Sequence, residues 1–117
     1  MAIQVSIYLN ESDKHGDRLL YWAILEYLHS AKIAGATVLR AYAGFTGRGP
    51  LKTGLGGHGR EELPLVLTFI DTESHVDEVM PKLAEMVGDR LIVQENVDVR
   101  HGLPGDAASQ RIKKLFK

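Results

Sequence analysis

A short glycine turn late in the chain carries the residues with the clearest chemical potential, Gly88, Asp89 and Arg90. A turn that begins with glycine can point several backbone N–H groups at one anion. The guanidinium of Arg90 can add charge-assisted hydrogen bonds to a phosphate. The alternative is an ordinary helix end, capped by glycine and followed by a surface arginine. The turn therefore predicts either a phosphate cradle or a helix cap.

Other charged residues lie where they could join such a site. Arg40 and Arg100 fall in segments with strand periodicity. Turned inward in an assembly, each could bind an anion, and otherwise each would form a cross-strand ion pair. A polar group after the first strand consists of Glu11, Asp13, Lys14 and His15. These side chains could contact a ligand, position a neighbouring loop, or form a solvated turn.

Histidine raises the question of a metal site, because imidazole is the usual ligand where cysteine is absent. The chain has five histidines and no cysteine. They show no close ligand spacing, although His15, His58 and His101 could meet near one end of the fold. No Ser-His-Asp order, carboxylate pair or Walker-type loop supports catalysis. We therefore expect a binding protein with no metal site, and not an enzyme.

Composition excludes several classes of protein. A chain of 117 residues predicts a single domain with its own core. The formal net charge of −1 argues against a nucleic-acid-binding protein, which would carry a basic excess. No apolar run is long enough for a membrane span. The first residues have the pattern of a strand and do not resemble a signal peptide. A soluble, cytoplasmic protein is expected.

Hydrophobic periodicity predicts the elements that would position these residues. Apolar residues at a period of two predict strands over 3–9, 37–45, 62–70 and 91–100. Helical spacing predicts one helix capped by Asp17 and ended by Gly35, after a polar loop over 10–16. It predicts another from Thr72 to Gly88, which Pro81 should bend or break. A glycine-rich segment over 47–60 predicts a long mobile loop.

The element order β-α-β-β-α-β predicts an α+β fold, the ferredoxin-like split-βαβ sandwich with an antiparallel sheet. Right-handed crossovers place the first and third strands at the centre and both helices on one face. Three connections then emerge at one end of the sheet. The other face would remain uncovered although it is rather apolar, with Tyr8, Leu39, Ala41, Val66, Thr68 and Ile70. Self-association would cover it, so we predict a closed homo-oligomer.

Several phrases together resemble the PII-like (GlnB-like) proteins, and most of all the domain-of-unknown-function 190 family within them. The segment 7–15, Ile-Tyr-Leu-Asn-Glu-Ser-Asp-Lys-His, is similar to that family's opening pattern. The segment 34–40, Ala-Gly-Ala-Thr-Val-Leu-Arg, is similar to its second strand. Leu-Pro-Leu-Val at 63–66, with Asp71, is similar to its third. The resemblance covers a domain over 1–101, leaving 102–117 as a linker and a short basic tail.

The resemblance implies a homotrimer that binds an adenine nucleotide (ATP, ADP or AMP) in clefts between subunits. It implies that the 47–60 loop contacts a partner protein, either a membrane transporter or an enzyme. The implied ligand-binding residues are Gly35, Thr37, Gly44, Phe45, Gly47, Gly88, Asp89, Arg90, Arg100 and His101, with Glu11, Lys14 and His15 beside them. Gly35 and Thr37 would face the cleft from the neighbouring chain. The turn has one glycine fewer than the usual PII turn, and Arg90 replaces its lysine.

Two other functions stay open at this point. The CutA proteins share the fold, so a metal-binding trimer is an alternative, with His15 and His58 as the residues to test. An interaction protein with no small ligand is another. The basic tail over 107–117 is expected to be a packed or frayed terminus, with docking to a membrane surface as the other interpretation.

Overall fold

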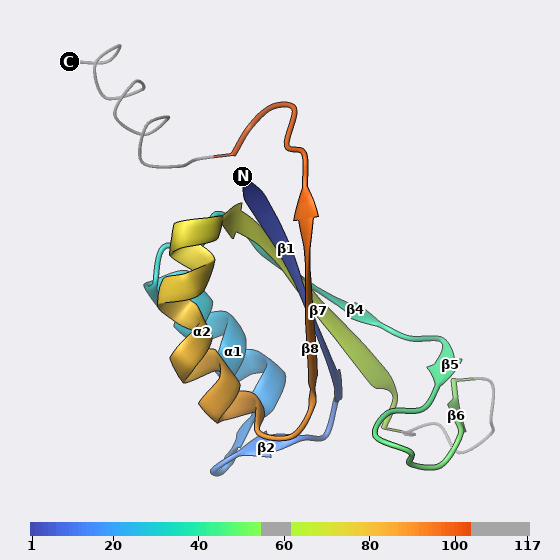
Figure 1. Ribbon diagram of the computed structural model, residues 1–117. Coiled ribbons are helices and arrows are strands. Elements are labelled where there is room, and N and C mark those ends of the chain that lie inside the picture. The colour runs from blue at the N-terminus through green and yellow to red at the C-terminus, as the bar shows by residue number, and fades with distance from the viewer. Residues whose placement is uncertain (55–61, 104–117) are drawn as a thin grey trace.

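The computed structural model describes residues 1–54 and 62–103 and shows one four-stranded antiparallel sheet with two helices against one face (Figure 1). The sheet strands are β1 (Ala2–Asn10), β4 (Ala36–Arg40), β7 (Pro64–Thr72) and β8 (Leu91–Val97). The helices are α1 (Leu20–Ser30) and α2 (Glu73–Val87). Two small hairpins join β2 (Lys14–His15) to β3 (Arg18–Leu19) and β5 (Ala43–Gly44) to β6 (Lys52–Thr53).

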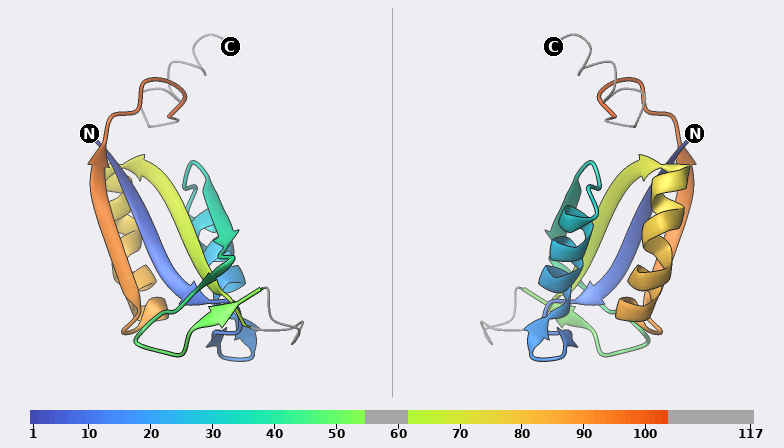
Figure 2. Two further views of the ribbon diagram at one scale, coloured as in Figure 1. Left: turned by 90° about the vertical axis from the view of Figure 1, so that its right-hand side faces the viewer. Right: turned by 90° about the vertical axis from the view of Figure 1, so that its left-hand side faces the viewer.

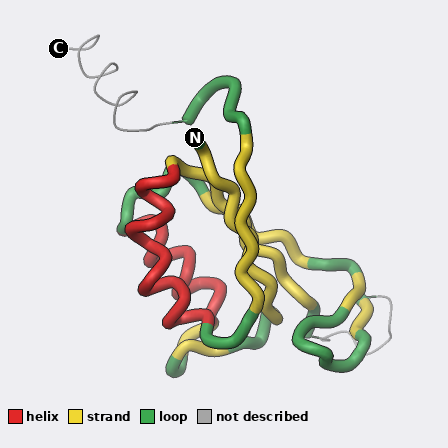
Figure 3. Tube along the Cα trace, viewed as in Figure 1, coloured by secondary structure: helices red, strands yellow, loops and turns green. Residues whose placement is uncertain are grey.

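The strand order β4-β7-β1-β8 confirms the predicted ferredoxin-like topology. β1 and β7 occupy the centre, and β4 and β8 form the edges. Both helices lie side by side on one face of the sheet, and the opposite face is open (Figure 2; Figure 3). None of the helices in the described residues is long and apolar enough to cross a membrane.

The core lies between the helices and the inward face of the sheet. Alternate residues of the two central strands are buried, including Ile7 and Leu67, which are both fully buried. The helices contribute residues at helical spacing, such as Ile24 from α1 and Leu83 from α2. The period-two and period-3.6 patterns therefore locate the core correctly, because each pattern follows the geometry of its element.

The predicted limits of the first helix are wrong. Asp17 does not cap α1, because it lies in the turn of the β2–β3 hairpin and the helix begins after Leu19 without a side-chain cap. The backbone N–H of Leu20 instead donates to the carbonyl of Asp13 at 2.7 Å. Gly35 does not end α1 either. The helix ends at Ser30, and Lys32 takes the left-handed conformation, with φ of 67°.

Two of the predicted strands are too long at one end, and the third lies two residues later than predicted, at Pro64–Thr72. The second strand breaks after Arg40, so Gly44 belongs to the small β5–β6 hairpin and Phe45 follows it. The fourth strand ends at Val97, which leaves Arg100 outside the sheet. By contrast Thr72 caps α2 as predicted, accepting from the N–H of His75 at 3.3 Å, and Gly88 ends it. Pro81 does not break the helix, which continues through it to Val87.

The open face of the sheet carries a row of large apolar side chains. The strand register places Leu39 opposite Val66, Val66 opposite Tyr8, and Tyr8 opposite Leu91. Leu39 is 64% exposed and Leu91 58% exposed. The row therefore runs across all four strands with little to cover it in one subunit.

Candidate ligand site between the two ends of the sheet

The sheet has two ends that matter for function. We call the end at Asn10, Arg40 and Leu91 the turn end, and the end at Ala2, Thr72 and Val97 the terminal end. Three connections meet at the turn end, as predicted: β1 to α1, the β4–β7 connection, and α2 to β8 (Figure 1). The chain continues past Val97 at the terminal end, beside Met1 (Figure 1).

At the turn end, Glu11 binds the connection between β4 and β7. Its carboxylate accepts two hydrogen bonds from Arg40, from Nε and Nη2, both at 2.9 Å. It also accepts from the backbone N–H of Leu63 at 3.1 Å. The hydrogen bond from Arg40 lowers the pKa of Glu11 despite some desolvation, with the Leu63 N–H adding to the effect. Within the subunit, Glu11 thus positions the start of the hairpin loop, one of the roles predicted for it.

Arg90 also has a carboxylate partner within the subunit. Its Nε donates to Oδ2 of Asp13 at 2.7 Å, and the same oxygen accepts from the backbone N–H of Asn10 at 2.9 Å. Its Nη1 donates to the carbonyl of Val87 at 3.0 Å, at the end of α2. Arg90 therefore ties the glycine turn to the β1–α1 connection. A phosphate bound here would share the guanidinium with Asp13.

The glycine turn has the backbone geometry that requires glycine. Gly88 adopts φ of 67° and ψ of −130°, which side chains with a Cβ rarely reach. Its N–H donates to the carbonyl of Ala84 at 3.0 Å, so this group serves as a helix cap. Asp89 is exposed, and Arg90 is partly buried. The helix-cap interpretation of the turn is thus correct for one subunit.

The other predicted residues of the turn end lie around this cluster. Lys14 and His15 are exposed on the β2 strand. Gly44, Phe45 and Gly47 lie in or beside the β5–β6 hairpin, which projects past the sheet away from the helices (Figure 1). Residues 55–60 of the predicted 47–60 loop lie outside the described part of the chain, so its predicted mobility stays a prediction.

Gly35, Thr37 and His101 meet between the terminal end and the middle of the sheet, where Thr37 pairs with Thr68. They line a cavity of about 330 Å³ together with Thr68, Ile70 and Leu103. Arg100 and His101 line a neighbouring cavity of about 750 Å³, next to Met1 and Thr72. Thr37 and His101 are both exposed. Residues from β4 and from the segment after β8 therefore form a second polar group.

These two groups lie at opposite ends of one subunit. Tyr8 pairs with Leu91 at the turn end, and Ala2 pairs with Val97 at the terminal end. Six strand residues separate Ala2 from Tyr8, which corresponds to about 20 Å. Gly88 to Arg90 therefore cannot meet Arg100 and His101 inside one chain. His15 and His101 are separated in the same way, so the predicted approach of these histidines is wrong for one subunit.

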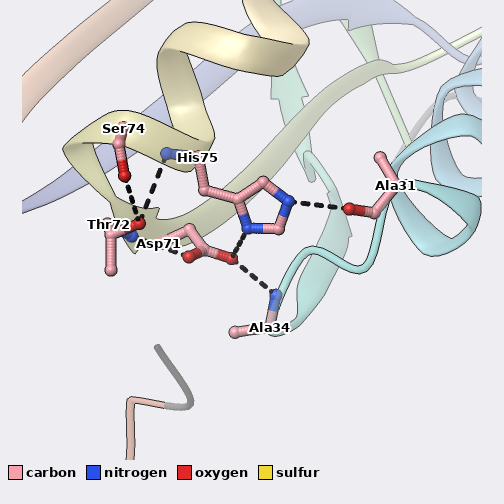
Figure 4. Close-up of polar contacts among 6 residues, drawn as sticks. All are labelled: Ala31, Ala34, Asp71, Thr72, Ser74 and His75. Atoms are coloured by element: carbon pink, nitrogen blue, oxygen red, sulfur yellow. Dashed lines mark hydrogen bonds and ion pairs between the residues drawn. The ribbon is translucent and has the colours of Figure 1, made fainter. Parts of the chain in front are cut away.

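A histidine that we did not single out forms the most buried polar cluster (Figure 4). The Asp71 side chain is 1% exposed and lies 3.1 Å from Nδ1 of His75. Its Oδ2 also accepts from the N–H of Ala34 at 2.8 Å, and its Oδ1 from that of Thr72 at 2.7 Å. Nε2 of His75 lies 2.7 Å from the carbonyl of Ala31. The sequence contains a signal for this cluster. Asp71 lies near the end of an apolar strand, and His75 follows it four residues later.

This cluster joins two parts of the fold. It connects the β7–α2 junction to the α1–β4 loop, which leads into Gly35 and Thr37. The described residues contain no group of three or more His, Asp or Glu side chains placed to hold a metal ion. His58 lies outside the described part of the chain.

Comparison with solved structures agrees with the fold. The structure is similar to CPII from Thiomonas intermedia K12, solved bound to ADP and bicarbonate, with a TM-score of 0.54 and 13% identity, over 86% of this chain and 89% of that chain. It is also similar to CutA1 from Pyrococcus horikoshii, with a TM-score of 0.54 and 15% identity, over 96% of both chains. CutA1 from Ehrlichia chaffeensis gives 0.53 and 10% identity, over 97% and 92%. At such identities the likeness establishes the fold alone.

Sequence comparison goes further. The UPF0166 protein MJ1524 of Methanocaldococcus jannaschii is 32% identical over 83 residues, which cover 71% of this chain and 76% of that protein. The sequence profile of the DUF190 family, described as "Uncharacterized ACR, COG1993", matches residues 2–99. Since this match spans nearly all of the described fold, the chain belongs to the DUF190 family, as the sequence phrases indicated.

Proposed function

We propose that this protein is a PII-like regulatory binding protein, without catalytic activity, that assembles as a homotrimer. Each cleft between subunits binds an adenine nucleotide, ATP, ADP or AMP. The 47–60 loop contacts a partner protein, such as a membrane transporter or an enzyme. The similar fold of CPII, which was solved with ADP, supports the choice of ligand class.

The position of the two polar groups carries this proposal. One group, around Gly88 and Arg90, lies at the turn end, and the other, around Arg100 and His101, lies at the terminal end. The two groups stay apart within one chain, so a cleft that contains both needs two subunits. A head-to-tail contact joins the turn end of one subunit to the terminal end of the next, and it closes into the proposed trimer when each subunit is rotated by a third of a turn from the last. Such a ring forms one complete cleft at every interface.

The chemistry of the combined cleft suits a nucleotide. The backbone N–H of Asp89 and the guanidinium of Arg90 would face the phosphates, with Arg100 of the neighbouring subunit adding charge. Binding would require Arg90 to share or exchange its contact with Asp13. The ligand would therefore compete with an internal ion pair, and its binding would be coupled to the β1–α1 connection.

Isothermal titration calorimetry with ATP, ADP, AMP and a cyclic nucleotide tests the proposal. Replacing either arginine, in Arg90→Ala or Arg100→Ala, should weaken binding at least tenfold, since a hydrogen bond to a charged group contributes about 1.5–3 kcal/mol. Arg18→Ala is a matched control, because Arg18 pairs with Glu26 on α1 and lies outside both groups. Absence of heat with every nucleotide at millimolar concentration would refute nucleotide binding.

Mixed assemblies test the sharing of the cleft between chains. Refolding Arg90→Ala and Arg100→Ala chains together would give about a quarter of the clefts both intact arginines, one from each chain. Those clefts should bind with the affinity of the unmodified protein. If no binding returns although mixed assemblies form, both arginines serve the same chain and the head-to-tail arrangement is wrong.

The metal-binding alternative has less support in this chain. Its predicted ligands His15 and His101 lie at opposite ends, and the described residues offer no cluster of three ligands. Titration with copper or zinc, comparing the unmodified chain with His15→Ala and His58→Ala, decides between the two functions. Micromolar metal binding that these variants lose, in the absence of nucleotide binding, would favour the CutA-like function.

A further inference from the structure

The pair formed by Asp71 and His75 fixes the loop between α1 and β4 at two points (Figure 4). This α1–β4 loop consists of residues 31–35. Nε2 of His75 lies 2.7 Å from the carbonyl of Ala31, at the start of the loop. Oδ2 of Asp71 accepts from the N–H of Ala34 at 2.8 Å, near the end of the loop. Both anchors come from the junction of β7 and α2.

The α1–β4 loop leads directly to residues of the proposed ligand cleft. Ala34, Gly35 and Thr37 all line the cavity of about 330 Å³. Within the loop, Lys32 adopts φ of 67°, a left-handed conformation that is costly for a residue with a Cβ. The loop therefore depends on contacts from its surroundings to keep this shape, and a change in those contacts would move the wall of the cavity.

The number of protons on the His75 ring decides whether both of its contacts can form. The ring faces two acceptors, the Asp71 carboxylate at Nδ1 and the Ala31 carbonyl at Nε2. When the ring loses one proton, an N–H remains on one side and an unprotonated nitrogen faces an oxygen on the other. The charged carboxylate is the stronger acceptor, so the N–H stays at Nδ1. The contact with Ala31 is the one that is lost.

Groups from three elements act on the charge of this ring. Partial burial lowers the pKa of His75, but the Ala31 carbonyl and the charges of Asp71 and Glu78 together raise it above its ordinary value of about 6.5. Ala31 follows α1, Asp71 belongs to β7 and Glu78 to α2. The first turn of α2, in which His75 lies, disfavours a cation, whereas the carbonyl end of α1 favours one. The His75 side chain is 22% exposed, so protons from the solvent can reach it.

We propose that protonated His75, paired with Asp71, holds the α1–β4 loop in the position that presents Gly35 and Thr37 to the ligand cleft. Loss of the proton releases the loop and weakens ligand binding. His75 is thus a positioning residue, because it acts on the ligand through the loop. The inference rests on the proposed function, in which Gly35 and Thr37 face the cleft from the neighbouring chain, and it adds a dependence of ligand affinity on pH.

An NMR titration of the unmodified chain without ligand tests the effect on the loop. The ring signals of His75 give the midpoint of its titration. The backbone amide signals of Gly35 and Thr37 should move with the same midpoint, because the loop carries the change to them. Ile7, in the centre of β1, should keep its amide signal. In His75→Gln, which cannot change its charge, the transition at Gly35 and Thr37 should be absent.

Calorimetric titration with ADP tests the effect on binding. At about pH 5.5 the unmodified protein should bind ADP at least about fivefold more tightly than His75→Gln, and at about pH 8.5 the two should differ less. Comparing the two proteins at each pH cancels the titration of ADP itself. His29→Gln is the matched control, because His29 is exposed on α1 outside this cluster, and it should behave as the unmodified protein does. Circular dichroism and light scattering establish that each variant is folded and equally assembled.

The outcomes separate this inference from the proposed function. An equal ratio of affinities at both pH values would overturn the inference and leave nucleotide binding intact. So would amide signals of Gly35 and Thr37 that stay in place while His75 titrates. If ADP and the other nucleotides give no heat with any chain, the proposed function is wrong. The NMR titration of the unmodified chain then decides by itself whether His75 controls the loop.

Discussion

At the scale of single residues, the contacts of His75 favour its protonated form. Nδ1 faces the carboxylate of Asp71 and Nε2 faces the carbonyl of Ala31, and both partners are acceptors. A neutral imidazole carries one N–H and can donate to only one of them, whereas the doubly protonated ring can donate to both. Partial burial works against the charge, but the hydrogen bond to Ala31 and the charges of Asp71 and Glu78 raise the pKa of His75 overall.

This contact predicts a pH-dependent stability. The pKa of His75 in the folded protein lies above its unfolded value of about 6.5, so the stabilisation is complete below that value. It is lost as the pH rises through the folded-state pKa. In urea unfolding at about pH 5.5, His75→Gln should lower the free energy of unfolding by about 1–2 kcal/mol, and by less at about pH 8.5.

Replacing Asp71, the partner of His75, gives a second test of the pH-dependent stability. Asp71→Asn keeps one oxygen, so only one of the N–H groups of Ala34 and Thr72 retains its acceptor, and it removes the charge that favours the protonated ring. Its unfolding free energy should therefore fall less steeply with rising pH than that of the unmodified protein. If His75→Gln shows the same pH profile as the unmodified protein, the pKa of His75 does not differ between the folded and unfolded states, and the prediction is wrong.

At the scale of elements, the end of α2 depends on glycine at position 88. Its φ of 67° with ψ of −130° is costly for any residue with a Cβ. Gly88→Ala should lower the free energy of unfolding by about 1–3 kcal/mol, measured in urea. Gly35→Ala is the matched control. Gly35 lies outside the left-handed region and has no heavy atom within 4 Å of an added Cβ, so its replacement should be neutral or stabilising by up to about 1 kcal/mol.

Two results would contradict the prediction for these glycines. Equal losses at both positions would mean that backbone conformation does not set the cost at Gly88. A loss at Gly35 alone would point to a packing role for the α1–β4 loop in the assembled protein. Both variants are to be compared at one protein concentration, because assembly adds to apparent stability.

The strands and helices also show which features of the fold can be predicted from the sequence. The alternation around Ile7 and Leu67 predicted the strands and their buried faces, because a strand in a one-sided sheet must alternate. The ends of α1 could not be predicted in this way. Asp17 resembles a cap, yet the β2–β3 hairpin takes it away from the helix, and the Asp13 carbonyl receives the N–H of Leu20 instead. Local propensity is overridden there by a contact between segments.

The candidate site was also predicted only in part from the sequence. Topology predicted that three connections meet at the turn end, and they do. It did not predict that Arg90 would pair with Asp13, or that Arg40 would pair with Glu11, because several acidic and basic residues could have paired there. The family resemblance supplied the residues of the terminal end, and their meeting around Thr37 and His101 depends on the path of the chain after β8.

At the scale of the whole molecule, the open face and the two polar groups point to the same assembly. The row from Leu39 to Leu91 crosses the sheet from one edge strand to the other. A second row pairs Thr37 with Thr68 and Ser6 with Val93, so polar side chains lie beside the apolar ones. Packing three such faces around one axis, as in the proposed trimer, would bury the apolar row, and with the strands running across that axis it would place unlike ends at each interface.

This arrangement predicts that one charge on the row disrupts both assembly and binding. Leu91 is 58% exposed in the subunit, so Leu91→Glu should leave the subunit fold intact while placing a carboxylate in the proposed interface. Light scattering should show a fall from three chains to one, and nucleotide titration of the same sample should lose its heat. Leu91→Met keeps the apolar volume and should retain both properties. A Leu91→Glu protein that stays trimeric would place the interface elsewhere. One that becomes monomeric yet binds nucleotide with unchanged affinity would show that a single chain holds the complete site.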